Sequence, residues 1–122
     1  MRRVVDGDTL ILDNDEYVNL IGVDAPVTKR VGKDAASFTR KLVEGKRVRL
    51  EFDRATAVID HKDRYGRTLA YVFLEEGTLL NGEIIKQGYG FVLTRFPFAR
   101  LEEFRRLETE AREERRGLWK TP

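Results

Sequence analysis

Apolar and polar residues alternate along the first part of the chain, a pattern typical of half-buried β-strands. Val4, Val5 and the segment 10–12 flank a polar Asp-Gly-Asp-Thr stretch, and a second apolar segment follows at 18–23. The polar cluster 13–16 between them predicts a hairpin turn. Pro26 ends the second segment, because proline has no N–H to donate to a neighbouring strand. We therefore expect an extended first segment, a hairpin turn and a second strand.

The remaining chain alternates between helical and strand patterns. Apolar residues recur at intervals of three and four from Ala35 to Leu42, which predicts a helix over 34–44. Asp34 suits the positive end of that helix, and Gly45 suits its left-handed stop. The other expected elements are strands over 48–52, 69–74 and 89–93, a short helix over 79–87 and a final helix with an apolar stripe at Leu101, Phe104, Leu107 and Ala111.

This order of elements predicts an α+β fold built on a small antiparallel barrel of the OB type. A chain of 122 residues without cysteine is long enough to bury a core with no disulfide. We expect residues 1–122 to form one domain, and nothing in the sequence demands more than a monomer. Met1 lies three residues before the first strand, which is compatible with a domain excised from a longer protein.

Charge and hydropathy narrow the function classes only slightly. A net charge of +2 does not by itself indicate an acidic partner. Basic residues gather at 29–33, 46–49 and 62–67, although each run alone reads as a solvated face. No apolar run approaches the roughly 20 residues needed to cross a bilayer, so we expect no membrane partner. The first residues lack the pattern of a signal peptide, and the absence of cysteine leaves the compartment open.

Carboxylates near the N-terminus suggest a site for a hard cation. In an extended segment Asp6 and Asp8 point to the same side, and Gly7 lets the backbone approach a ligand closely. Asp8 would then meet Asp24 across neighbouring strands. Two carboxylates with a backbone carbonyl and waters would make a loose calcium site. For Asp6 and Asp13 the alternative, a turn aspartate bonded to its own backbone, is equally compatible with the pattern.

An arginine in a polar turn suggests a second kind of ligand. Arg67 follows Gly66 just before a buried strand, and a planar guanidinium matches two phosphate oxygens at once. Arg64 and Tyr65 flank the turn, as a phosphate-binding or base-stacking surface would require. The same residues are also compatible with an ordinary β-turn. His61 is the only histidine and reads as an exposed turn residue, so no histidine-rich metal site is expected.

Three segments, Asp6 to Leu10, Leu20 to Pro26 and Asp63 to Phe73, resemble the signature segments of staphylococcal nuclease-like, or thermonuclease, domains. The resemblance extends to the Arg-Gly-Leu-Trp stretch at 116–119 and so covers essentially the whole chain. It implies an OB-fold, five-stranded antiparallel Greek-key barrel with three helices. It also implies a calcium-dependent phosphodiesterase that acts on DNA and RNA.

The resemblance also assigns roles to individual positions of this chain. For the metal site it implies that Asp8, Asp24 and the Ala25 carbonyl are calcium ligands. Asp6 would organise the metal-bound water. For the phosphate site it implies that Arg67 holds the scissile phosphate, with Arg64 and Tyr65 beside a neighbouring phosphate.

Two positions depart from the family's pattern. Asn19 stands where the family has an arginine, and Val27 stands where it has a glutamate that acts as general base. Neutral Asn19 cannot share the transition-state charge with Arg67, and Val27 cannot accept a proton. Losing a general base costs about 10²–10⁴-fold in rate, and losing one preorganised donor costs on the order of 10²–10³-fold. These departures predict impaired hydrolysis.

Three functional hypotheses follow. The first is a domain that binds calcium and the phosphodiesters of single-stranded DNA or RNA but hydrolyses them poorly. The second is an active calcium-dependent nuclease with a relocated base, for which Glu16, Lys29 and Arg30 are the nearest candidates. The third is a purely structural or protein-interaction barrel in which these residues serve folding alone.

Overall fold

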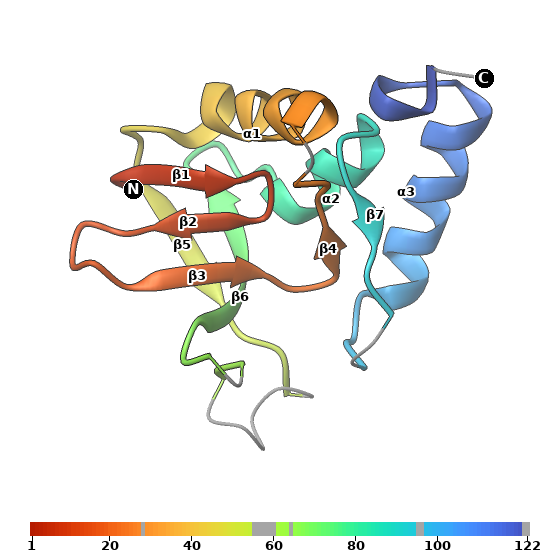
Figure 1. Ribbon diagram of the computed structural model, residues 1–122. Coiled ribbons are helices and arrows are strands. Elements are labelled where there is room, and N and C mark those ends of the chain that lie inside the picture. The colour runs from red at the N-terminus through yellow and green to blue at the C-terminus, as the bar shows by residue number, and fades with distance from the viewer. Residues whose placement is uncertain (28, 55–60, 64, 95–96, 121–122) are drawn as a thin grey trace.

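The computed structural model describes residues 1–27, 29–54, 61–63, 65–94 and 97–120, and the side chains of 29–32 are not described. Two sheets and three α-helices lie within these residues (Figure 1). The larger sheet contains β1 (Arg3–Asp6), β2 (Thr9–Ile11), β3 (Tyr17–Leu20), β5 (Val48–Glu51) and β6 (Thr68–Leu74). The smaller sheet pairs β4 (Val23–Asp24) with β7 (Phe91–Val92). The helices are α1 (Lys29–Val43), α2 (Leu80–Lys86) and α3 (Leu101–Glu113), and the short 3₁₀-helix η2 (Gly117–Lys120) follows them.

The strand order β1-β2-β3-β6-β5 confirms the predicted α+β fold of the OB type and corrects one detail of it. The expected barrel was wholly antiparallel, but β3 and β6 run parallel, so the sheet is mixed. Within the described residues no ladder joins β1 to β5. Backbone pairing therefore leaves the barrel partly open, as is common for this fold.

The segment 18–23 is not the single strand that its apolar pattern predicts. Gly22 has a φ of +77° and bends the chain between β3 and β4, so that the two halves enter different sheets. A Cβ at Gly22 would lie 2.6 Å from the ring of Phe98, so only glycine fits this bend. The strand expected over 89–93 is likewise shorter, because only Phe91 and Val92 pair with β4.

The helices follow the predicted pattern except at one boundary. α1 begins at Lys29, five residues before the predicted start, so Asp34 lies inside the helix and not at its positive end. Gly45 has a φ of +76° just after α1, which confirms its predicted role as the left-handed stop. α2 and α3 form where the sequence predicts them, with Phe104 and Ala111 of the α3 stripe buried. No helix in the described part of the chain is long and apolar enough to cross a bilayer.

A buried carboxylate connects the end of β5 to the segment before α3. Asp53 is 4% exposed, accepts a hydrogen bond from the Tyr71 hydroxyl and accepts another from the Ala99 N–H at 2.7 Å. The Arg100 guanidinium lies 5.3 Å from the centre of the Tyr71 ring. Burial, followed by the bond to the negative Asp53, raises the pKa of Tyr71 above its ordinary value.

This raised pKa predicts a specific alkaline instability. A raised folded-state pKa stabilises the protein below the unfolded tyrosine pKa of about 10, and the stabilisation is lost as the pH rises further. Above pH 10 the stability of the unaltered chain should therefore fall relative to that of Tyr71→Phe, by about 1.4 kcal/mol per pH unit. Urea unfolding of both proteins between pH 8 and pH 11.5 measures the difference. A constant difference over this range would contradict the prediction.

Candidate active site

Asp8 lies in the tight turn between β1 and β2, and both of its carboxylate oxygens have backbone or hydroxyl neighbours. Its Oδ2 accepts a hydrogen bond from the Ala25 N–H at 3.0 Å, and its Oδ1 lies 3.1 Å from the Thr9 hydroxyl. The segment is therefore not extended as predicted, because Gly7 and Asp8 turn the chain after Asp6. The turn brings Asp8 against Ala25, next to the Asp24 that the sequence predicts as its neighbour.

Close packing explains why this turn contains a glycine. A Cβ at Gly7 would lie 2.7 Å from the Cβ of Ala25 and 3.0 Å from the Cβ of Ala35. The buried Thr39 hydroxyl of α1 donates a hydrogen bond of 2.7 Å to the Gly7 carbonyl. The absence of a side chain at Gly7 thus lets α1 and the Ala25 segment hold the turn from two sides.

Negative charge accumulates around Asp8. Burial is the main cause that raises the pKa of this carboxyl, and the charges of Asp6 and Asp24 raise it further. The hydrogen bonds from Ala25 and Thr9 act in the opposite direction. A nearby cation favours the ionised form of such a carboxyl, because the cation offsets both the repulsion from like charges and the lost solvation.

The donor set fits a loosely held cation and not a fully enclosed one. No group of three or more His, Cys, Asp or Glu side chains in the described residues is placed to hold a metal ion. Asp24 is exposed, whereas Ala25 is buried beside Asp8. Two carboxylates completed by a carbonyl and waters match the oxygen chemistry that calcium accepts. The ligand roles of Asp8, Asp24, Ala25 and Asp6 stay predictions.

Asp63 holds Arg67 in the polar turn that the sequence predicts. The Oδ2 of Asp63 accepts a 2.7 Å charged hydrogen bond from the Arg67 Nε, and its Oδ1 accepts bonds from the N–H groups of Tyr65 and Arg67. The Arg67 guanidinium also lies 5.3 Å from the centre of the Tyr65 ring. Asp63 was given no role from the sequence, although an aspartate at the start of such a turn is a known Asx-turn signal.

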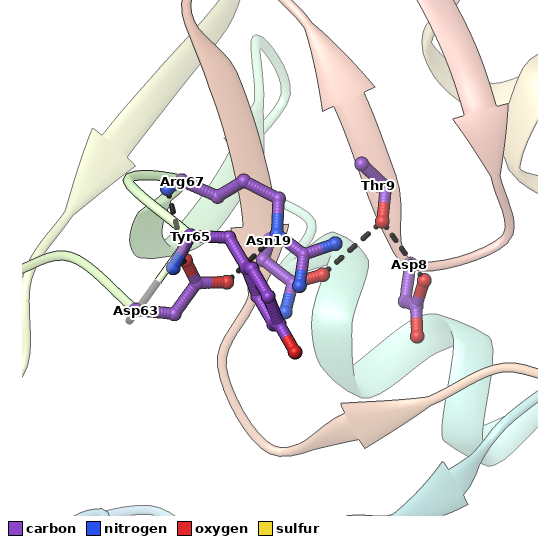
Figure 2. Close-up of polar contacts among 6 residues, drawn as sticks. All are labelled: Asp8, Thr9, Asn19, Asp63, Tyr65 and Arg67. Atoms are coloured by element: carbon purple, nitrogen blue, oxygen red, sulfur yellow. Dashed lines mark hydrogen bonds and ion pairs between the residues drawn. The ribbon is translucent and has the colours of Figure 1, made fainter.

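One row of residues connects Arg67 with Asp8 across three adjacent strands. Asn19 of β3 pairs with Thr9 of β2 on one side and with Leu69 of β6, two residues after Arg67, on the other. The Thr9 hydroxyl lies 3.1 Å from Asn19 Oδ1 and also contacts Asp8 (Figure 2). Sequence reasoning missed Thr9, because its partner Asn19 lies ten residues away on the neighbouring strand. The fold therefore places the residue predicted to bind phosphate and the residue predicted to bind metal in one row across the sheet.

The structure describes both positions at which the sequence departs from the family's pattern, and their catalytic importance stays a prediction. Asn19 is half-buried in the row just described, so an amide occupies the place between Arg67 and Asp8. Val27 is 71% exposed and has no proton-accepting atom. Glu16, one candidate for a relocated base, is bonded to the Thr68 hydroxyl.

Other sequence predictions fall outside the described residues. Arg64, predicted to lie near a phosphate, is not described, and neither are the side chains of Lys29 and Arg30. Tyr65 is described and is 69% exposed beside Arg67, as a contact with a bound strand would require.

The chain is similar to proteins of one nuclease family. A family model described as staphylococcal nuclease homologue matches residues 17–121. The thermonuclease of Staphylococcus intermedius is 46% identical over 98 residues, which is 72% of this chain and 55% of that protein. The thermonuclease of Staphylococcus hyicus is 36% identical over 132 aligned residues, covering 96% of this chain and 72% of that protein.

A more distant relative is the endonuclease YncB of Bacillus subtilis strain 168. It is 32% identical over 129 aligned residues, covering 96% of this chain and 59% of that protein. The chain thus spans little more than half the length of two of these three relatives.

Proposed function

Because the chain belongs to the staphylococcal nuclease family, we propose that it binds the phosphodiester backbone of single-stranded DNA or RNA together with a calcium ion, and that it hydrolyses the bound strand poorly. The alternatives are an active nuclease and a purely structural barrel. The row from Arg67 through Asn19 to Asp8 favours the first of these three, because it keeps both binding groups and lacks the groups for turnover.

The Arg67 side chain is preorganised for binding an anion. Asp63 fixes its Nε, which orients the guanidinium before any ligand arrives. Its side chain is 35% exposed, so donors remain accessible at the surface. A guanidinium held in this way can donate two parallel hydrogen bonds to phosphate oxygens. This arrangement supports phosphate binding, because the guanidinium is both oriented by Asp63 and accessible at the surface.

Asp8 and Asp24, with the carbonyl of Ala25, would hold the calcium ion, and Asp6 would orient its waters. A bound calcium ion offsets the negative charge of a phosphate and polarises its oxygens. The crowding of negative charge at Asp8 supports a cation at this place. The chain's own residues would then bind the phosphate between Arg67 and the acidic cluster.

Hydrolysis needs two further contributions that this chain does not offer at the family's positions. A base must take a proton from the attacking water, and Val27 has no atom that can do so. A second positive charge must stabilise the transition state, and Asn19 is neutral. The site is therefore suited to binding a strand without rapid cleavage.

Two substitutions test the binding function. Arg67→Ala should weaken the binding of a fluorescein-labelled single-stranded oligonucleotide by at least about tenfold, because it removes charge-assisted hydrogen bonds. Asp8→Ala should abolish the heat of calcium binding in calorimetric titration. Fluorescence anisotropy at fixed salt, with calcium or with chelator, measures the first effect.

Arg105→Ala is the matched control, because Arg105 is an exposed arginine of α3 that forms an ion pair with Glu102 on the same helix. It should leave both measurements unchanged. Equal loss of affinity in Arg67→Ala and Arg105→Ala would point to general charge attraction and not to a site. Absence of oligonucleotide and calcium binding in the unaltered chain would instead support the structural barrel.

A further inference from the structure

A pocket borders Arg67 at the opposite end of β3 from Asp8. Leu20, at the end of β3, donates its N–H to the Asp8 carbonyl at 2.9 Å, whereas Tyr17 begins β3 and lines the pocket. The cavity measures about 740 Å³ and includes Arg67 in its wall. Pockets of about 300–1,000 Å³ hold small organic ligands, so the cavity has room for a nucleobase.

Two exposed aromatic rings border this pocket. Tyr17 is 47% exposed and Tyr65 is 69% exposed, and both line the same pocket. Exposed aromatic rings beside cationic groups are the stacking platforms on which proteins hold the bases of single strands. Because the Arg67 guanidinium lies over the Tyr65 ring, the expected phosphate-binding residue and one of the two stacking rings are in contact.

Carboxylates in the same wall suggest what part of a nucleotide enters. Asp15 and Glu16 line the pocket together with Lys62. Glu16 Oε2 accepts a hydrogen bond from the Thr68 hydroxyl, and the Lys62 ammonium donates to that hydroxyl at 3.2 Å. These bonds fix the Glu16 carboxylate, which can still accept further hydrogen bonds. A carboxylate repels a phosphate but attracts the N–H groups on a base edge.

We propose that this pocket binds the nucleobase next to the phosphate that Arg67 holds. The base stacks on Tyr17 and Tyr65, and Glu16 accepts a hydrogen bond from its exocyclic amino group. Bases that carry such a group, as cytosine does, are preferred over thymine, which has none. This inference rests on the proposed binding of single-stranded nucleic acid and adds a base preference to it.

Two oligonucleotides of equal length, oligo(dC) and oligo(dT), test the preference, because both carry one pyrimidine per phosphate. Fluorescence anisotropy at one salt concentration should give about tenfold tighter binding of oligo(dC) by the unaltered chain. Glu16→Leu should abolish the preference, because leucine has no atom that can accept a hydrogen bond from the cytosine amino group. Equal affinities in the unaltered chain, or an unchanged preference in a folded Glu16→Leu protein, would overturn the proposal.

Tyr17→Thr tests the stacking platform while keeping a residue that favours strands. It should weaken the binding of both oligonucleotides on the order of 5- to 100-fold, and Tyr17→Phe should bind like the unaltered chain. Circular dichroism and thermal melting establish that both variants fold. A folded Tyr17→Thr protein with unchanged affinity would overturn the stacking role.

The same titrations separate this inference from the proposed function. If the unaltered chain binds both oligonucleotides equally well and Arg67→Ala binds neither, the phosphate site stands and the base pocket does not. If the unaltered chain binds neither oligonucleotide, both proposals fail.

Discussion

Combined replacement of Asn19 with arginine and Val27 with glutamate is expected to raise the calcium-dependent hydrolysis of single-stranded DNA by on the order of 10²-fold or more. Arginine at position 19 would add a positive charge between Arg67 and Asp8, where charge develops on the phosphate. Glutamate at position 27, three residues after Asp24, would supply a carboxylate that can act as the base; the present side chain there is 71% exposed. Release of acid-soluble nucleotides with calcium or with chelator measures the gain.

The single variants and a metal-site variant control this experiment. Each single substitution should restore less than the pair, since groups that act as a unit are not additive. Adding Asp8→Ala to the pair should remove the gain, because Asp8 is the proposed ligand of the calcium ion. Strong calcium-dependent activity in the unaltered chain would contradict the impaired site. An inactive double variant would show that these two positions do not account for the impairment.

Asn81→Ala is expected to lower the free energy of unfolding by about 2–6 kcal/mol. Asn81 is fully buried in α2, and its Oδ1 accepts a hydrogen bond from the Val72 N–H at 2.9 Å. Its Nδ2 donates to the carbonyls of Ile21, at 2.9 Å, and Ala70, at 3.2 Å. Alanine would leave the Val72 N–H and the Ile21 carbonyl buried without these partners, at about 1–3 kcal/mol each.

Such a loss would be a large part of the 5–15 kcal/mol typical of a small protein. Chemical denaturation followed by circular dichroism measures it. Gln87→Ala is the matched control, because Gln87 follows the same helix and, among the described residues, its side chain bonds to Glu83 alone, at 3.0 Å. Its effect should stay within about 1 kcal/mol. Similar losses in the two variants would contradict the role assigned to Asn81.

Asn81 also illustrates what an apolar pattern leaves out. Within the predicted helix 79–87 it reads as one polar position among several. In the folded protein it joins α2 to β6 and to the bend after β3. Its partners are 9, 11 and 60 residues away, and no local periodicity encodes such distances.

Two predicted element boundaries were wrong: the end of the strand expected over 18–23 and the start of α1. The apolar run 18–23 continues through Gly22, and only the rings of Phe98 and Phe104 around that glycine reveal the bend between β3 and β4. At Gly22, packing against distant residues overrode the local pattern. α1 also begins before Asp34, at Lys29, and nothing in the described contacts explains this early start.

The residue types and their spacing were enough to predict the helices, most strands, the OB-type class and the polar turn that holds Arg67, because these depend on neighbours a few positions apart. The residue types and the family resemblance also predicted which groups would bind metal and phosphate, and at which two positions catalytic groups would be missing, and these assignments stay predictions. Tertiary structure alone decided which of these groups meet. The row from Arg67 through Asn19 to Asp8, and the pocket between Tyr17 and Tyr65, exist because strands distant in sequence pair in one register. That register is fixed by non-local hydrogen bonds and close packing, such as the contacts of Gly7 with Ala25 and Ala35.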